Sequence, residues 1–349
     1  AAARLQAALA KPSSIRGGAR RISSGIGVTL VSDDQPDAER ILANANIALY
    51  EAQGAGPGNI RYFREDLRAE VERRETLYTE MLAGLDNGEF VPFFQPQIDL
   101  KTGGFAGFEA LVRWHHPRHG LLTPAAFLDF ADETDLAERI GEAVLSGTLS
   151  ALRAWDAAGL DVPIVGVNFA LAQLRDPSLI EKIKWETERC DIEPDRLAIE
   201  VLETVLIKSD QDLVVRNLRG LASTGFGIEL DDFGTGHASI SNLRRFMVNR
   251  IKIDRSFVFG IETSDEQQQL TASMIAMARA LGISTLAEGV ETEDAEMILR
   301  RLDCDYMQGF LIAKPMSLED TFTWLRGYNG RPYSELPPPA LEARDPNTP

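Results

Sequence analysis

Short apolar segments alternate with longer amphipathic segments between residues 88 and 330, and this alternation constrains the fold more than any other feature. The apolar segments predict buried strands, and the amphipathic segments predict helices that pack against them. Eight such strands favour an α/β fold of the (β/α)8 barrel type over a doubly wound sheet. The predicted strands are Phe90–Pro96, Gly107–Trp114, Pro163–Phe169, Leu197–Leu202, Ile228–Asp231, Arg250–Ile253, Ser284–Ala287 and Tyr306–Leu311. The predicted helices are Leu136–Ala158, Leu179–Cys190, Asp210–Ser223, Asp265–Leu281, Asp294–Leu302 and Leu318–Arg326.

Three segments outside the barrel differ in character. The first has a strand-like run over Arg20–Val31 and helical spacing over Pro36–Ala52, and it is short for a core of its own. The second segment, residues 65–87, is charged and free of helix breakers, which predicts a connecting helix. The last segment, residues 331–349, is rich in proline, which predicts a loosely ordered tail. The predicted domains are residues 1–64 (mixed segment), 65–87 (connecting helix), 88–330 (barrel) and 331–349 (tail).

The composition excludes several partners. The formal net charge of −17 argues against a nucleic-acid polymer, because phosphate binding relies on Lys and Arg. No apolar stretch reaches the ~18 residues that span a bilayer, so we expect no membrane contact from this chain. Cys190 and Cys304 are isolated, which is typical of core thiols in a reducing compartment, here the cytoplasm. The start Ala-Ala-Ala-Arg predicts a piece of a longer protein, whose other parts can include a membrane anchor.

Polar side chains lie at the ends of the predicted strands, where the active site of such a barrel gathers. Any one of them can be explained by solvation or by local backbone hydrogen bonds. Eight successive strands that end in this way, inside apolar runs, instead predict a functional site. The residues are Gln95, Glu109, Asn168, Glu200, Asp231 with Asp232, Lys252, Glu288 and Gln308.

Asp231 and Asp232 end a buried run and precede Gly234 and Gly236, which let the chain turn sharply. Two adjacent carboxylates at the end of a buried strand repel one another, so the stretch predicts a cation nearby. For this stretch alone the alternative is an exposed pair that caps the next helix.

The set of candidate ligands is all oxygen, because it holds five carboxylates and a carboxamide but no His or Cys. Such a set favours Mg²⁺ or Mn²⁺ over zinc. Asp231 and Asp232 can bridge two ions about 3.5–4 Å apart, an arrangement suited to phosphodiester hydrolysis. Arg113, on the same face as Glu109, offers a fork for a phosphate oxygen. Lys252, surrounded by acids, is expected to stay protonated and to polarise the attacking water rather than act as the general base.

The segment Glu109-Ala110-Leu111-Val112-Arg113-Trp114 resembles the signature of EAL-domain cyclic di-GMP phosphodiesterases. Further motifs of that family follow in order over residues 76–328, so the resemblance does not depend on one motif. It implies a (β/α)8-like barrel, hydrolysis of cyclic di-GMP to the linear dinucleotide pGpG, and a homodimer through the barrel. The other motifs are Gln95-Pro-Gln-Ile-Asp-Leu100, Val167-Asn168, Glu200-Val-Leu-Glu203, Leu230-Asp-Asp-Phe-Gly-Thr-Gly236, Ile251-Lys-Ile-Asp-Arg-Ser-Phe-Val258, Ala287-Glu-Gly-Val-Glu291, Met307-Gln-Gly-Phe310 and Lys314-Pro315.

The resemblance also implies a role for each matching residue. The first metal ion falls to Glu109, Asn168, Glu200 and Asp231, and the second to Asp231, Asp232 and Glu288. The catalytic residues are Lys252, Glu288 and Asp232. Substrate contacts fall to Gln95, Leu111, Arg113, Asp254, Gln308 and Pro315. Supporting roles fall to Thr235, to Glu291 behind the site, and to Glu203 as the anchor of the loop after Asp232.

The first segment resembles the C-terminal part of a GGDEF (diguanylate cyclase) domain, through Ser23–Val28 and Ala45–Gln53. The signature loop and metal-binding strand of that family are absent, and Asn46 and Gln53 stand where the family usually has Asp and Lys. We therefore expect no cyclase activity from this chain.

Few positions depart from the EAL pattern, and none removes an expected metal ligand. Ala170 replaces a common Ser, Leu202 a frequent Thr, and His237-Ala238 an aromatic-Ser pair, which leaves loop behaviour and rate open. His237 also predicts a pH dependence near its unperturbed pKa of about 6.5.

The alternative to an enzyme is a receptor that binds cyclic di-GMP without cutting it. A protein kinase is excluded, because the Asp232-Phe-Gly234 motif has no HRD-like or Gly-rich loop ahead of it.

Overall fold

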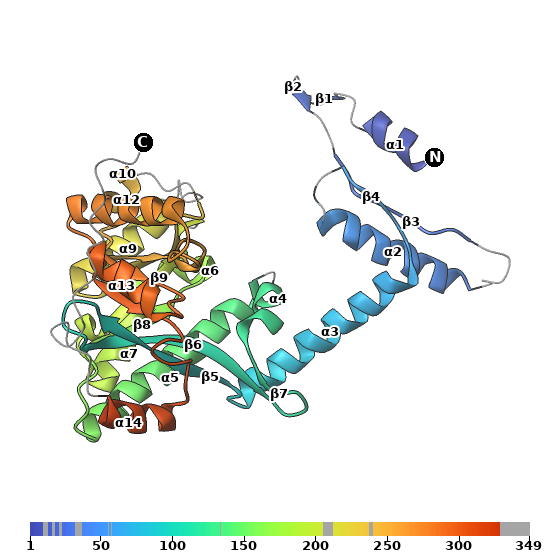
Figure 1. Ribbon diagram of the computed structural model, residues 1–349. Helices are drawn as coiled ribbons and strands as arrows, with labels where there is room; N and C mark the ends of the chain where they lie inside the picture. Colours follow the sequence, from blue (N-terminus) through green and yellow to red (C-terminus); the bar gives the residue numbers. More distant parts are fainter. Residues whose placement is uncertain are drawn as a thin grey trace, which may run out of the picture. The chain divides into compact units, whose positions relative to one another are not determined.

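The chain forms two compact units, Ala1–Ala83 and Gly84–Pro349, in a computed structural model (Figure 1). No described helix combines the length and apolar character needed to cross a bilayer. The structure describes residues 1–9, 13–15, 18–20, 23–31, 37–54, 56, 58–132, 134–204, 212–236 and 240–328.

In the first unit a helix packs on a small parallel strand pair. Strand β3 (Ile26–Val28) pairs with β4 (Ile60–Tyr62), and helix α2 (Ala38–Gly54) covers them. A side chain at Gly27 would place its Cβ 2.2 Å from the Ala45 carbonyl oxygen, so glycine permits this close approach. The remaining elements are α1 (Ala2–Leu9), the antiparallel pair β1 (Ser13–Ile15) and β2 (Gly18–Arg20), and α3 (Glu65–Asp86).

The strand predicted over Arg20–Val31 is wrong in length. Only Ile26–Val28 forms β3, because these residues alone find partners in β4, and Arg20 belongs to β2. The predicted helix is confirmed at Ala38–Gly54, and Pro36 lies outside the described residues.

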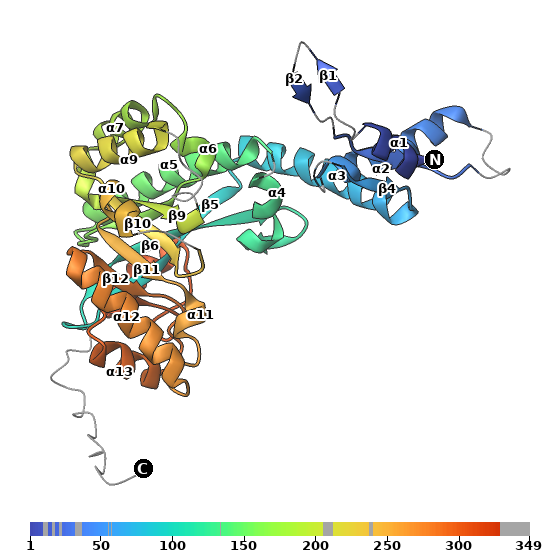
Figure 2. The ribbon, with the colours of Figure 1, turned by 90° about the horizontal axis from the view of Figure 1, so that it is seen from above.

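The second unit is a closed barrel of eight strands, which confirms the predicted α/β barrel fold. Seven strands run parallel in the order in which they occur in the sequence, and the sheet closes through pairing of the first strand with both the second and the last. Figure 2 shows helices outside the strands of this barrel. The strands are β5 (Phe90–Asp99), β6 (Phe105–His116), β8 (Val165–Asn168), β9 (Leu197–Leu202), β10 (Gly227–Phe233), β11 (Arg250–Ile253), β12 (Ser284–Ala287) and β13 (Tyr306–Gln308), with β7 (Gly120–Leu122) as an added edge.

Strand β5 departs from the all-parallel arrangement expected of a (β/α)8 barrel. It pairs antiparallel with β6 and with β13, because a short turn rather than a helix joins it to β6. Gln95 therefore lies in the middle of β5, opposite Glu109, and not at a carboxyl end as predicted. Glu109 likewise lies within the long β6.

The helices begin and end within two residues of the predicted positions, except that the predicted start at Asp210 lies outside the described residues. They are α5 (Leu136–Ala157), α7 (Leu179–Cys190), α9 (Asp212–Thr224), α12 (Asp265–Leu281), α13 (Glu293–Arg301) and α14 (Leu318–Gly327). Short additional helices are η1 (Pro124–Ala126), α4 (Leu128–Asp132), α6 (Leu171–Leu174), η2 (Pro194–Arg196), α10 (Ile240–Arg245) and α11 (Arg255–Val258).

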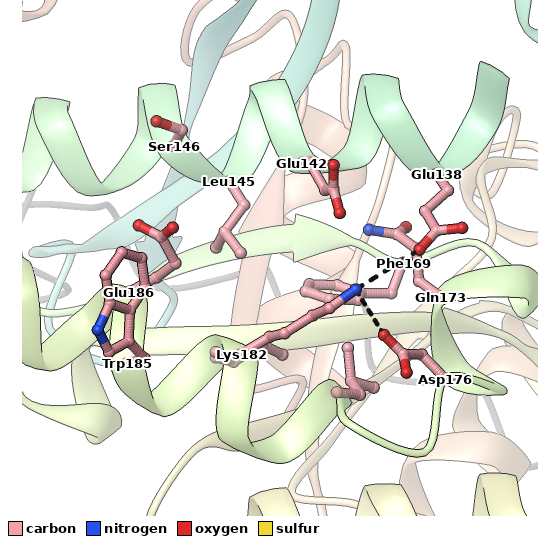
Figure 3. A pocket seen from close by; sticks show the side chains of 12 residues that line it. Glu138, Glu142, Leu145, Ser146, Phe169, Gln173, Asp176, Lys182, Trp185 and Glu186 are labelled. Atoms are coloured by element: carbon pink, nitrogen blue, oxygen red, sulfur yellow. Dashed lines mark ion pairs between the residues drawn. The ribbon is translucent and has the colours of Figure 1, made fainter.

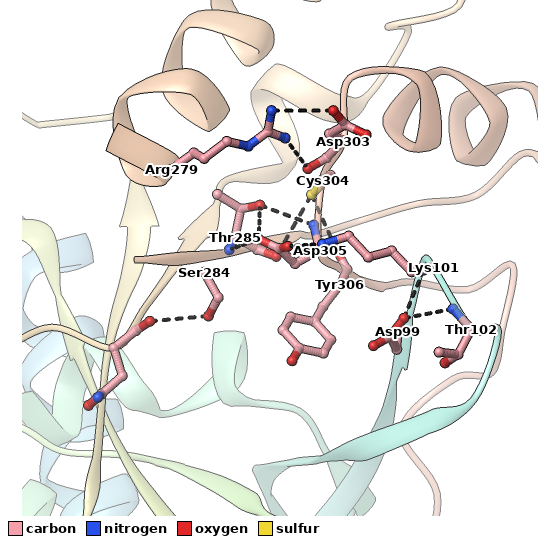
Figure 4. A network of polar contacts seen from close by, with 11 residues as sticks. Asp99, Lys101, Thr102, Arg279, Ser284, Thr285, Asp303, Cys304, Asp305 and Tyr306 are labelled. Atoms are coloured by element: carbon pink, nitrogen blue, oxygen red, sulfur yellow. Dashed lines mark hydrogen bonds and ion pairs between the residues drawn. The ribbon is translucent and has the colours of Figure 1, made fainter. Parts of the chain in front are cut away.

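A polar network ties the amino-terminal ends of β12 and β13 together (Figure 4). The Asp305 carboxylate accepts hydrogen bonds from the Thr285 backbone N–H at 3.0 Å and from its hydroxyl at 3.1 Å. The ammonium of Lys101 lies 3.1 Å from the same carboxylate. Burial raises the pKa of the neighbouring Cys304 thiol to about 11, so it remains a protonated core thiol. These contacts hold Tyr306 at the start of β13.

Aromatic side chains on the outer faces of β5 and β6 form the core beneath α5. Phe108 is fully buried, and its ring centroid lies 5.2 Å from Trp155 and 6.0 Å from Phe94. The Trp155 indole donates a hydrogen bond to the Thr321 hydroxyl at 2.8 Å, which links α5 to α14. Alternation along β5 and β6 thus points Phe94 and Phe108 outward and Gln95 and Glu109 into the barrel.

We expect Phe108→Ala to lower the free energy of unfolding by about 3–5 kcal/mol, because it opens a cavity among buried aromatic rings. Urea denaturation of the two proteins measures the difference. Phe259→Ala is the matched control, since that ring is 62% exposed and its removal should cost little. Equal losses for the two variants would contradict this account of the core.

Candidate active site

The ammonium of Lys252 is fully buried inside the barrel and surrounded by carboxylates. Its Nζ atom lies 2.8 Å from Glu200, 2.8 Å from Glu288, 3.1 Å from Asp231 and 3.2 Å from Glu109. These acids come from four different strands or strand ends, so the closed barrel brings together residues that the sequence separates.

One ammonium cannot balance four carboxylates. Burial by itself would lower the pKa of Lys252. The surrounding acids raise this pKa by more than burial lowers it, so it lies well above the ordinary value. Burial raises the pKa values of Glu200 and Glu288 well above those of ordinary glutamates. Burial also acts to raise the pKa of Glu109. The charge of Lys252 and a hydrogen bond from Gln308 more than offset this effect, so the pKa of Glu109 is lowered. Full ionisation of all four acids is therefore unfavourable with Lys252 as the sole cation beside them, and an added cation would favour it.

Asp232 reaches the site although it follows Asp231 directly. Successive side chains of a regular strand point to opposite faces. Asp232 has φ of 53°, and the register of β10 against β11 shifts between Leu230 and Phe233. This irregularity turns both carboxylates toward one site. Burial, followed by the charge of Asp231, raises the pKa of Asp232 to about 6.

Among the residues that the structure describes, two groups of three carboxylates could each hold a metal ion. In each group the candidate ligand oxygens lie within 4.8 Å of one another, and Asp231 belongs to both. Glu200 Oε1 is buried and has no hydrogen-bond partner among the described residues, so it is an acceptor that a cation would satisfy. Because every candidate donor is oxygen, the residues fit a hard divalent cation. The groups are Glu109, Glu200 and Asp231, and Asp231, Asp232 and Glu288.

Asn168 and Gln308 lie beside the first of these groups. The Asn168 amide donates to Glu109 Oε1 at 3.0 Å, and the Gln308 amide donates to Glu109 Oε2 at 2.6 Å. Both oxygens of Glu109 thus accept hydrogen bonds from side-chain amides of other strands, β8 and β13.

Glu203 holds the loop that follows the aspartate pair. Its Oε2 atom accepts hydrogen bonds from the backbone N–H of Gly234 at 2.9 Å and of Gly236 at 3.1 Å. The Thr235 hydroxyl donates to the Asp232 carbonyl at 2.8 Å. Gly234 has φ of 102°, a conformation that glycine adopts without strain. The predicted effect of His237 and Ala238 concerns residues outside those that the structure describes.

A cavity of about 400 Å³ opens beside the acids. Three of the predicted substrate residues line it, namely Gln95, Leu111 and Gln308. Glu291 also lines it and is exposed, whereas the sequence placed it behind the site. The full lining comprises Gln95, Glu109, Leu111, Asp231, Arg255, Glu288, Gly289, Glu291, Gln308, Gly309 and Phe310.

The other three predicted substrate residues are not among those that line this cavity. The Arg113 guanidinium donates to the Val112 carbonyl at 2.8 Å and lies 5.7 Å from the Phe93 ring centroid. The Asp254 side chain accepts from the Ser256 N–H and caps α11. Pro315 precedes the bridge of Met316 to Phe94.

Sequence reasoning missed Arg255 and Phe310 as cavity residues. A signal was present, because both residues belong to the quoted motifs Ile251–Val258 and Met307–Phe310 and the Phe310 side chain is 54% exposed. Their residue types alone did not distinguish them from ordinary surface positions.

A larger cavity, of about 440 Å³, lies between α5 and α7 (Figure 3). Leu145 of α5 and Ile183 of α7 are among the residues that line it, and Lys182 lies 2.7 Å from Asp176 at its edge. It contains neither group of candidate metal ligands. Size alone therefore does not identify the candidate active site.

Comparison with known families identifies the barrel. The model described as "EAL domain" matches residues 78–315, about two thirds of the chain. The chain belongs to the EAL domain family. The EAL match begins within α3 and covers all eight barrel strands.

Several EAL relatives are longer than this chain. An uncharacterized signaling protein of Caulobacter vibrioides is 36% identical over 93% of this chain and 39% of its own length. The bifunctional diguanylate cyclase/cyclic di-GMP phosphodiesterase MucR of Pseudomonas aeruginosa is 34% identical over 86% of this chain and 44% of its own length. The cyclic di-GMP phosphodiesterase PdeR of Escherichia coli is 31% identical over 88% and 46%. The chain thus spans less than half the length of these curated relatives.

Solved structures agree with the fold of this EAL domain. The MucR phosphodiesterase in its c-di-GMP complex has a TM-score of 0.67 at 34% identity, and the match covers 70% of this chain and 99% of that one. The EAL enzyme Bd1971 in a cAMP-bound form has a TM-score of 0.69 at 27% identity, with 75% and 72% covered.

We expect Lys252→Met to lower the free energy of unfolding by about 3–5 kcal/mol in EDTA, because it leaves buried carboxylates without their cation. Added Mg²⁺ should restore part of the loss. Urea denaturation with and without Mg²⁺ measures both effects. In the control, Lys101→Met, the side chain is 68% exposed and the cost should be about 1 kcal/mol or less. A Lys252→Met protein as stable as the parent in EDTA would refute this view of the cluster.

Glu203→Ala should raise the Mg²⁺ concentration needed for half-maximal activity and lower turnover by about 10–100-fold, because the loop after Asp232 loses its anchor. Glu203→Gln keeps one acceptor oxygen and should lose less. Turnover measured over a Mg²⁺ titration distinguishes the variants. Unchanged turnover and metal dependence in Glu203→Ala would mean that Glu203 only ends its strand.

Proposed function

We propose that this EAL domain hydrolyses cyclic di-GMP to linear pGpG with two divalent metal ions, Mg²⁺ or Mn²⁺. The observation that carries the proposal is the position of Asp231 in both carboxylate groups, next to a cavity of about 400 Å³. A shared carboxylate is the feature that a two-metal phosphodiesterase requires. Relatives named cyclic di-GMP phosphodiesterases support the choice of substrate.

The proposed first ion is held by Glu109, Asn168, Glu200 and Asp231, and the second by Asp231, Asp232 and Glu288. When bound, the ions activate a water for attack on phosphorus and stabilise the leaving oxygen. The residues of the chain orient the reactants around them.

Lys252 is cationic and has no lone pair with which to accept a proton, so we assign it the orientation of the attacking water. Asp232 and Glu288 belong to the second carboxylate group, and they are the candidates to receive the proton. In the cavity, Gln95, Leu111 and Gln308 contact the substrate, and Phe310 offers an aromatic face for a guanine. We keep Arg113, Asp254 and Pro315 as proposed contacts of the bound dinucleotide.

A receptor that binds cyclic di-GMP without hydrolysis is the second candidate. It requires the same cavity but not the acids. The structure of this chain brings both carboxylate groups together, which favours the enzyme.

For the first unit we propose a remnant of a GGDEF domain that makes no cyclic di-GMP from GTP. Strand β3 and helix α2 are the elements that carry the resembling residues. A homodimer through the barrel and a cytoplasmic location are also proposals, and they rest on the resemblance to the family.

Purified protein incubated with cyclic di-GMP and Mg²⁺ or Mn²⁺ should yield pGpG, and excess EDTA should abolish the product. Ca²⁺ should substitute poorly, because its longer bonds would spread the bridged ions. Glu109→Gln should lower turnover by at least about tenfold, whereas Glu138→Gln, an acid of α5 away from the site, should not. Chromatographic separation of substrate and product measures this. Binding of cyclic di-GMP without any product would favour the receptor.

A further inference from the structure

A chain of buried side-chain amides runs through the barrel below the acids. Arg250 Nη1 donates to Gln97 Oε1 at 3.0 Å, and Gln97 Nε2 donates to Gln308 Oε1 at 3.0 Å. Gln308 Nε2 then donates to Glu109 at 2.6 Å and to Gln95 Oε1 at 3.0 Å. These side chains belong to residues that are at most 9% exposed. We call Arg250, Gln97 and Gln308 the amide relay.

The inward-pointing side chains lie in two layers along the barrel: Arg250 and Gln97 in the lower layer, and Lys252, Gln95 and Glu109 in the upper layer. Arg250 and Lys252 lie two residues apart on β11, so both side chains point into the barrel and Lys252 lies nearer its carboxyl end. Gln97 pairs with Gln308 across β5 and β13. Because β5 is antiparallel, Gln95 lies one layer above Gln97, beside Glu109. The relay therefore crosses from the lower layer to the acids.

The two ends of the relay set the direction of both amides. Arginine can only donate, so Gln97 must turn its oxygen toward Arg250 and its NH₂ group toward Gln308. Gln308 must then turn its oxygen toward Gln97 and its NH₂ group toward Glu109. An ionised carboxylate can only accept, so the orientation required at the upper end is the same. Reversal of either amide would set two acceptors or two donors face to face.

Arg250 is itself held in the lower layer. Its Nη1 atom lies 3.1 Å from Glu229 Oε1, and its guanidinium carbon lies 4.2 Å from the Tyr306 ring centroid. Tyr306 follows Asp305, whose hydrogen bonds fix the start of β13 (Figure 4). Glu229 therefore balances the charge of Arg250, and the stacked ring limits its movement.

We infer that Arg250 and Gln97 are positioning residues for the active site: they hold the Gln308 amide with its NH₂ group toward Glu109 and so orient a proposed metal ligand and the glutamines that line the cavity. This inference rests on the proposed function for its effect on turnover. The expected effect on metal binding by Glu109 can be measured whether or not the protein has turnover. Neither residue touches the cavity, so both act through Gln308.

Two substitutions at Gln97 test the inference without removing the Arg250–Glu229 pair. Gln97→Glu keeps an acceptor for Arg250 but loses the donor to Gln308, and Gln97→Met loses both. Gln269→Glu adds the same charge as Gln97→Glu on the exposed face of α12 and is the matched control. The measurements are the dissociation constant of Mn²⁺ from the protein alone, by electron paramagnetic resonance of free Mn²⁺, together with kcat and KM for cyclic di-GMP and the melting temperature.

We expect both Gln97 variants to bind Mn²⁺ about tenfold more weakly than the parent and to lose about tenfold or more in kcat/KM. A simple effect of charge would have the opposite sign, because an added carboxylate near the site should tighten cation binding in Gln97→Glu. A purely structural role would lower the melting temperature and leave the Mn²⁺ dissociation constant unchanged.

Parental Mn²⁺ affinity in both variants would overturn the inference, as would tighter binding in Gln97→Glu with parental binding in Gln97→Met. If the parent itself made no pGpG, the proposed function would fail. The Mn²⁺ dissociation constants would still decide whether the relay orients Glu109.

Discussion

The ammonium of Lys252 is the interaction on which the interior of this barrel depends. It lies within 3.2 Å of four carboxylates and is itself fully buried. Without it those acids would repel one another in a site of low polarity. Lys252 alone does not offset four ionised carboxylates, so the same arrangement that permits folding also favours the capture of a further cation.

Closure of the barrel by an antiparallel strand extends this polar interior downward. Because β5 runs against β6 and β13, it brings Gln95 beside Glu109 and Gln97 beside Gln308. The lower layer then has its own buried ion pair, Arg250 with Glu229. The two cations on β11 lie in successive layers. Arg250 is paired with Glu229 of the neighbouring β10, whereas Lys252 is surrounded by acids from four strands or strand ends. Buried polar groups of this kind are stable only when their partners are present, which makes their geometry specific.

The apolar and polar faces of the strands have separate tasks. Outward rings such as Phe108 pack against Trp155 and stabilise the barrel, while inward side chains build the site. The aspartate pair is the exception to strand geometry, since Asp232 adopts a left-handed conformation to reach the same site as Asp231. The hydrogen bonds of Glu203 to Gly234 and Gly236 hold the loop that follows this irregularity.

Residue type and spacing were enough to predict the barrel strands and most of its helices, because burial repeats every two residues in a strand and every 3.6 in a helix. The acids that cluster inside the barrel were also recognisable from their positions at predicted strand ends. The direction of β5 could not be predicted in this way, since it depends on which strands lie beside it after closure. The same limit explains why Arg255 and Phe310 were missed and why Arg113 turns instead to Phe93. The amide relay joins Gln97 to Gln308 and Arg250 across more than 150 residues of sequence. Contacts over such separations leave no local pattern, so they follow from the closed barrel alone.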